Sequence, residues 1–71
     1  MDVGENIRLL RISRRMTQKE LGDKVHVSKA MIGYIETGKR ALPQDTGARI
    51  AEVFGCELAD LENKEYQVLA K

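Results

Sequence analysis

The chain has 71 residues, enough for one domain, and its single cysteine, Cys56, excludes a disulfide within the chain. Its formal net charge is only +1, and no apolar run approaches the roughly 20 residues that a membrane-spanning helix needs. The N-terminus lacks the uninterrupted apolar segment of a signal peptide, so we expect a cytoplasmic protein.

The small net charge conceals an asymmetry between the two halves of the chain. Residues 1–40 carry nine Lys and Arg against five Asp and Glu, whereas residues 41–71 carry three against six. An anionic partner would therefore meet the first half of the chain. The alternative is chance patterning in a small domain, and charge alone does not separate these two interpretations.

The first predicted helix runs from about Val3 to Arg14. Asp2 and Glu5 have the spacing of a capping box, and apolar residues then recur at helical intervals. Arg11 lies within the apolar face of this helix, where an unpaired charge would be costly to bury.

A second, shorter helix is predicted to start after Thr17 and to end near Lys24. Thr17 and Glu20 have capping-box spacing, and apolar residues follow at i, i+4. Gly22 is the small residue at which this helix would approach the next one. His26 follows in a turn that needs an unusual backbone, so we expect a positive φ there.

The stretch "HVSKAMIGYIETGKR", residues 26–40, predicts a third helix between two stops, with Ser28 as its N-cap and Gly38 as its terminator. One side carries Ile32 and Ile35. The opposite side is small and nearly uncharged, and consists of Ala30, Gly33, Tyr34 and Thr37. Two helices joined by so short a turn form a helix-turn-helix, whose second helix enters the major groove of DNA.

A fourth helix is predicted from about Gln44 to Phe54, ended by Gly55, and a short fifth helix within "CELADLEN". The last residues, "EYQVLA", either extend the fifth helix, form a short strand or are a disordered end. The expected fold is therefore all-α, a compact bundle of four or five short helices around one core.

The segment "TQKELGDKVHVSKAMIGYIETGKR" resembles the phage Cro and lambda-repressor type of helix-turn-helix, the xenobiotic-response-element family. The resemblance continues through "RIAEVFGCELADL" and covers about residues 4–61. It implies a lambda-repressor-like DNA-binding domain over residues 1–63, with the helix-turn-helix at about 17–37 and a tail at 64–71. The matching residues are Thr17, Gln18, Leu21, Val27, Ser28, Ile32, Ile35, Glu36, Gly38, Lys39 and Arg40.

Several positions depart from the family pattern, and they concern stability and local geometry rather than the DNA-facing surface. Gly22 replaces an Ala, while His26 and Arg15 replace turn glycines. Gly47 stands where a core Leu is common, so we expect loose packing of the fourth helix there. Glu57 replaces a Ser cap and is expected to weaken the start of the fifth helix.

The resemblance assigns base contacts to Lys29, Ala30 and Tyr34. Lys29 can reach a guanine edge or a phosphate, and Ala30 can touch a thymine methyl group. Small side chains on this face would let the helix backbone approach the base edges in a groove about 12 Å wide. The alternative is that this face packs against the rest of the protein or against a second subunit.

Phosphate contacts are expected on both sides of this helix. The N-terminal N–H groups of the second helix, near Thr17 and Gln18, form an anion site, and the family's matching Gln holds a phosphate. Thr37, Lys39 and Arg40 follow the third helix and would meet the same DNA backbone. The alternative for Lys39 and Arg40 is an ordinary solvated turn.

Glu36 is the counterpart of Arg11, a charge of opposite sign on an otherwise apolar face. We expect the two to form an ion pair that orients the third helix against the first, as the family also does. Cys56 stands where the family has a core Val, so we expect a buried apolar side chain. With one histidine, no cluster of metal-ligand spacing and no Gly-rich phosphate loop, we expect no enzyme, no metal and no cofactor.

The sequence thus predicts a DNA-binding transcriptional regulator of bacterial or phage type, a repressor by expectation, that binds a two-fold operator as a homodimer. A single unit of this size contacts too few base pairs for useful selectivity. The tail, with Tyr66, Val68 and Leu69, is the expected dimerisation element. The alternative is a protein-interaction module of the same fold, such as an antitoxin or a bridging coactivator.

Overall fold

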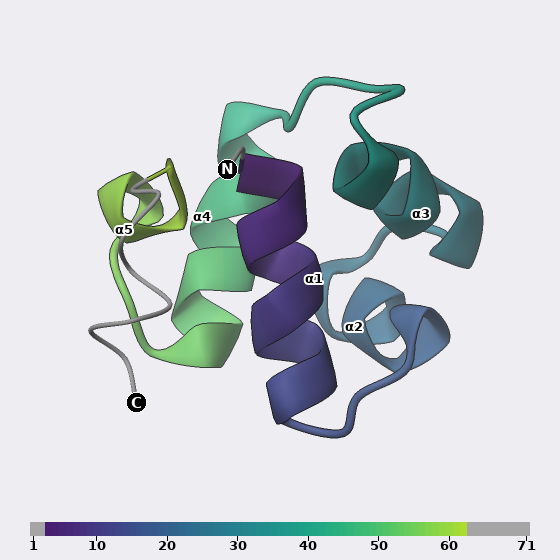
Figure 1. The fold of residues 1–71 in the computed structure, drawn as a ribbon, viewed down its shortest axis with the longest axis horizontal. Helices are drawn as coiled ribbons and strands as arrows, with labels where there is room; N and C mark the ends of the chain where they lie inside the picture. The colour runs from purple at the N-terminus through teal and green to yellow at the C-terminus, as the bar shows by residue number, and fades with distance from the viewer. Residues whose placement is uncertain (1–2, 63–71) are drawn as a thin grey trace.

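The structure, a computed structural model, describes residues 3–62 (Figure 1). These residues form five helices and no strand, so the all-α prediction is confirmed for this part of the chain. The Asp2 cap and the expected tail of residues 64–71 lie outside it. The helices are α1 (Val3–Ser13), α2 (Gln18–Val25), α3 (Lys29–Thr37), α4 (Gln44–Phe54) and α5 (Leu58–Glu62).

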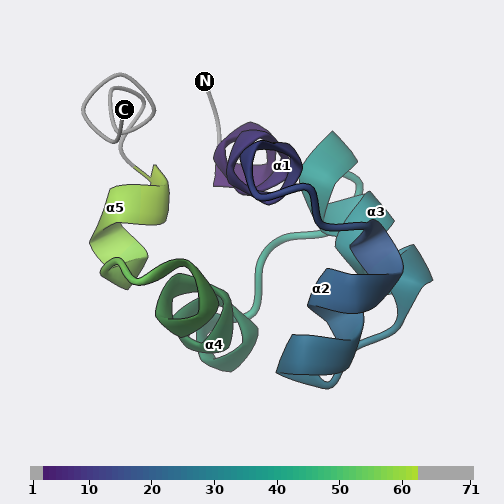
Figure 2. The same cartoon turned by 90° about the horizontal axis from the view of Figure 1, so that it is seen from below.

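In Figure 1, helix α1 lies between two pairs of helices, with α2 and α3 on one side and α4 and α5 on the other. Figure 2 shows the same pairs from below, with α1 at the edge of the molecule. Helix α1 packs on α3 and α5, and α2 packs on both α3 and α4. None of these helices combines the length and apolar character needed to cross a bilayer. The buried apolar core consists of Ile7, Leu10, Leu21, Val25, Ile32, Ile35, Ile50, Ala51, Phe54 and Leu61.

The caps predicted for the helix-turn-helix are present. The Thr17 hydroxyl accepts a hydrogen bond from the Glu20 N–H at 3.0 Å, and the Thr17 N–H donates to the Glu20 carboxylate at 2.8 Å. The Ser28 hydroxyl accepts from the Met31 N–H at 3.0 Å. Because these residues satisfy N–H groups that a helix leaves without an acceptor, they set where α2 and α3 begin.

The turn between α2 and α3 confirms the expected positive φ at His26, which is 64°. A Cβ on Gly22 would lie 2.5 Å from the carbonyl oxygen of Val27, so only glycine permits this close approach. Arg15 likewise takes a positive φ of 56° after α1. The chain thus places two L side chains where glycine is the less strained residue.

The expectation of loose packing at Gly47 is wrong. Gly47 is buried in α4, and a Cβ there would lie 2.7 Å from Cδ1 of Leu58 and 3.0 Å from Cδ2 of Leu42. The two leucines, from α5 and from the segment before α4, occupy the volume that a larger residue at position 47 would have filled.

Helix α5 begins despite the missing Ser cap. The backbone N–H of Glu57 donates to the Asp60 carboxylate at 3.0 Å, which supplies the second half of a capping box. Cys56 packs against the edge of the core but is only partly buried, so this side chain is less buried than expected. Its position after the α4 terminator Gly55 leaves it between helices rather than inside one.

Candidate nucleic-acid interface

The side of α3 that faces away from the core holds all three predicted base-contact residues. Lys29, Ala30 and Tyr34 are exposed, with 44% of Tyr34 accessible to solvent. Ile32 and Ile35 point the other way and are buried. The core therefore accounts for one side of α3 and leaves the other uncovered by the described residues.

This exposed side is concave. An open depression of about 360 Å³, here called the α3 hollow, runs along it. It gathers the three predicted base-contact residues and three of the five predicted phosphate-contact residues. Its lining consists of Gln18, Lys29, Ala30, Gly33, Tyr34, Thr37 and Lys39.

Two predicted phosphate-contact residues do not line the hollow. Arg40 is exposed just beyond it, and the backbone N–H groups of Lys39 and Arg40 both donate to the Tyr34 carbonyl, at 2.9 and 3.2 Å. The chain therefore turns tightly after α3 and keeps the backbone of both residues beside it. Thr17 precedes Gln18 at the start of α2.

The capping box determines which backbone N–H groups at the start of α2 can bind an anion. It uses the N–H groups of Thr17 and Glu20, so an anion has the first two N–H groups of the helix, those of Gln18 and Lys19. Hydrogen bonds from Thr17 lower the pKa of the Glu20 carboxyl below its ordinary value of 4.5. Glu20 is thus ionised at neutral pH, and Thr17 has only its hydroxyl proton for a phosphate.

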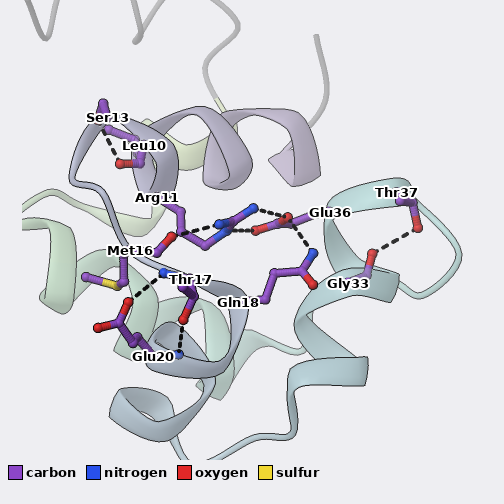
Figure 3. Close-up of polar contacts among 10 residues, drawn as sticks. All are labelled: Leu10, Arg11, Ser13, Met16, Thr17, Gln18, Glu20, Gly33, Glu36 and Thr37. Carbon is purple, nitrogen blue, oxygen red and sulfur yellow. Dashed lines mark hydrogen bonds and ion pairs between the residues drawn. The ribbon is translucent and has the colours of Figure 1, made fainter.

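Thr37 also has an internal partner. Its hydroxyl donates to the Gly33 carbonyl at 2.9 Å, one turn back along α3 (Figure 3). A phosphate oxygen is an acceptor, as this carbonyl is. The Thr37 hydroxyl must therefore give up its hydrogen bond to the Gly33 carbonyl before it can donate to a phosphate.

The expected ion pair between Arg11 and Glu36 is present, and it is bidentate. Nε and Nη2 of Arg11 donate to the two carboxylate oxygens at 2.6 and 3.0 Å (Figure 3). The side chains are 12% and 1% exposed, respectively. Nη1 of Arg11 also donates to the Met16 carbonyl at 2.7 Å, so one guanidinium joins α1, the segment before α2, and α3.

Sequence reasoning missed a third member of this network. Nε2 of Gln18 donates to Oε1 of Glu36 at 3.1 Å, and the three side chains point toward one another in Figure 3. A glutamine in the first turn of a helix is ordinary, so no sequence pattern distinguished this contact. It ties the predicted phosphate-contact residue of α2 to the buried carboxylate of α3.

The described residues include no group of three or more His, Cys, Asp or Glu side chains that could hold a metal ion. The α3 hollow is instead rimmed by Lys29 and Lys39, with Arg40 nearby. An exposed helix face with small residues at its middle and cations at its ends suits a polyanion with a groove.

The packing of α2 on α3 across a short turn defines a helix-turn-helix domain. The helix-turn-helix family profile matches residues 7–61, so the chain belongs to this family. The competence pilus inhibition repressor of Acinetobacter baylyi is 31% identical over 61 residues, which cover 86% of this chain. The chain spans only 56% of that repressor's length.

Two solved structures share the fold. The P22 c2 repressor in complex with a synthetic operator has a TM-score of 0.84 and 24% identity, and the match covers 89% of this chain and 96% of that one. The clp gene regulator ClgR from Corynebacterium glutamicum has a TM-score of 0.77 and 24% identity, with 83% and 63% covered. At this level of identity the likeness concerns the fold alone.

Proposed function

We propose that this chain is a transcriptional repressor that binds double-stranded DNA sequence-specifically, with α3 in the major groove. The observation that carries the proposal is the α3 hollow. It gathers six of the residues for which the sequence predicts DNA contacts on one exposed, concave side of the helix-turn-helix.

The dimensions of this surface suit the major groove. A helix with its side chains is about 10–12 Å across, and the groove is about 12 Å wide, so a bulky outer face would hold the helix away from the bases. Ala30 and Gly33 keep the middle of α3 thin. Lys29 and Tyr34 then reach base edges, while Ala30 contacts a thymine methyl group.

The phosphate-contact residues flank the residues proposed to read bases. Gln18 lies on the α2 side of the hollow, and Lys39 lies at its other end, beside Arg40. Thr17 and Thr37 complete the proposed set through their hydroxyl groups. Contacts to both DNA strands across one groove would fix the register in which α3 meets the bases.

A homodimer on a two-fold operator is part of the proposal. A two-fold pair would place its recognition helices about 34 Å apart, one turn of DNA. The dimer would use surface away from α3. A groove of about 440 Å³ lies there, lined in part by Val3, Leu42 and Leu58, and Glu62, the last described residue, borders it.

The names of the similar proteins support this function. One is a competence pilus inhibition repressor, one is the P22 c2 repressor in complex with a synthetic operator, and one is the clp gene regulator ClgR.

The test is selection of binding sites from random DNA with the purified full-length chain, followed by affinity measurement on the selected and scrambled duplexes at several salt concentrations. We expect a two-fold consensus, selective binding and a strong decrease in affinity with salt. Enrichment of no sequence, together with co-purification of a second protein chain, would favour the protein-interaction module instead.

A further inference from the structure

Gly33 differs from the other helical glycines because no close contact among the described residues requires glycine at this position. A Cβ on Gly4 would collide with the Ile35 carbonyl oxygen, and one on Gly22 would collide with that of Val27. A Cβ on Gly33 would instead meet only ordinary van der Waals neighbours, the nearest being Nε2 of Gln18 at 3.6 Å. The fold therefore accepts alanine at position 33.

Glycine within a helix is also unfavourable by about 1 kcal/mol relative to alanine. Gly33 lies inside α3, and its φ is not positive, so no turn or left-handed conformation requires it. What glycine provides here is an open space of methyl size. That space lies in the α3 hollow, beside the amide of Gln18.

The surroundings of this space indicate what would fill it. The Ala30 methyl group and the Tyr34 ring contribute apolar surface to the hollow, whereas Lys29 and Lys39 provide positive charge at its edges. The occupant should therefore be a small apolar group carried by a polyanion. Among the groups that base pairs present in the major groove, the 5-methyl group of thymine is the apolar one.

We propose that the space over Gly33 receives the 5-methyl group of a thymine, which makes Gly33 a specificity-determining residue. This inference rests on the proposed insertion of α3 into the major groove. An alanine at position 33 would place its own methyl group where the thymine methyl group lies. Cytosine, which has a hydrogen at C5, would leave the space empty.

The experiment uses the consensus selected by the full-length chain and replaces each thymine in turn with deoxyuridine, which removes only the methyl group. For the wild-type chain, removing the methyl group of one thymine, at the same position of either half-site, should weaken binding about fourfold, the effect of one buried methyl group. For Gly33→Ala, the same replacement should no longer weaken binding. Replacements at other thymines should affect both proteins equally.

A control variant separates this effect from a change in helix stability. Ala48→Gly alters helix propensity at an exposed position of α4, outside the hollow, and should reproduce the wild-type response to every replacement. If selective binding is found but no thymine shows a loss, or if the loss persists in Gly33→Ala, the methyl inference is overturned while the proposed function stands. Absence of any selective binding would overturn both.

Discussion

Gln18 and Glu36 lie 18 positions apart and are joined by a hydrogen bond of 3.1 Å from Nε2 to Oε1. Since an ionised carboxylate only accepts hydrogen bonds, Glu36 determines which end of the Gln18 amide faces inward. Glu36 is itself held by two hydrogen bonds from Arg11. The buried ion pair thus orients a side chain proposed to contact DNA.

Gln18→Ala and Arg40→Ala should weaken binding to specific and random duplexes alike, because phosphates carry no sequence information. The Arg40 variant should also flatten the slope of log K against log salt concentration by about 0.9 for each phosphate contact removed. Fluorescence anisotropy titrations at several salt concentrations measure both effects.

Arg49→Ala is the matched control for Arg40→Ala. It removes the same charge from α4, where the Arg49 guanidinium donates to the Val25 carbonyl at 3.5 Å. We expect its salt slope to equal that of the wild-type chain. If Arg40→Ala also leaves the slope unchanged, Arg40 is not a phosphate contact.

Lys29→Ala and Tyr34→Ala should lower specific affinity by about 1–3 kcal/mol and alter base preference. Both side chains project from the exposed side of α3, so the fold does not depend on them. Site selection repeated with each variant would show the change in consensus. Equal losses on specific and random DNA would contradict their role in reading bases.

Arg11→Ala should lower the free energy of unfolding by about 3–5 kcal/mol, because it leaves the Glu36 carboxylate buried without its cation. Urea denaturation followed by circular dichroism measures this. The double variant Arg11→Met/Glu36→Leu should lose less, since it removes both charges together. A loss below about 1 kcal/mol for Arg11→Ala would show that the pair does not hold α1 against α3.

Glu20→Gln should reduce the acid sensitivity of the chain. The hydrogen bonds from Thr17 lower the pKa of Glu20 in the folded chain below 4.5, so its contribution to stability is complete above pH 4.5 and is lost as the pH falls through the folded value. Glutamine preserves the capping box without titrating. The difference between the urea midpoints at neutral and acidic pH should therefore be smaller in the variant than in the wild-type chain.

A direct measurement checks the same prediction for Glu20. The carboxyl carbon of Glu20, followed by NMR against pH, should titrate with a midpoint below 4.5 in the wild-type chain. Thr17→Ala removes the hydroxyl acceptor of the box and should raise that midpoint. A wild-type midpoint at or above 4.5 would contradict the prediction.

Truncation after Asn63 should yield a monomer that still folds, because the five helices of residues 3–62 already bury an apolar core among themselves. We expect this monomer to bind the selected operator far more weakly than the full-length chain, since it contributes one recognition helix at a time. Analytical ultracentrifugation of both chains measures the assembly. Equal dimer populations would exclude residues 64–71 as the dimerisation element.

The sequence by itself determined the features that depend on neighbouring residues. The caps at Thr17, Ser28 and Gly55 act within one helical turn, so their residue types were enough to predict where α2 and α3 begin and where α4 ends. The Arg11–Glu36 pair was also predictable, because two opposite charges on apolar faces each need a partner.

Contacts between polar or small residues that lie far apart in the sequence became evident only from the tertiary structure, because no local sequence pattern predicts them. A glutamine such as Gln18 is also compatible with a solvent-exposed position. Its hydrogen bond to Glu36 forms because α2 and α3 pack at a distance that brings the two side chains together. The space beside Gly47 is likewise filled by Leu42 and Leu58, which reach it from other parts of the chain. Packing between helices depends on their mutual distance and rotation, which sequence periodicity does not encode.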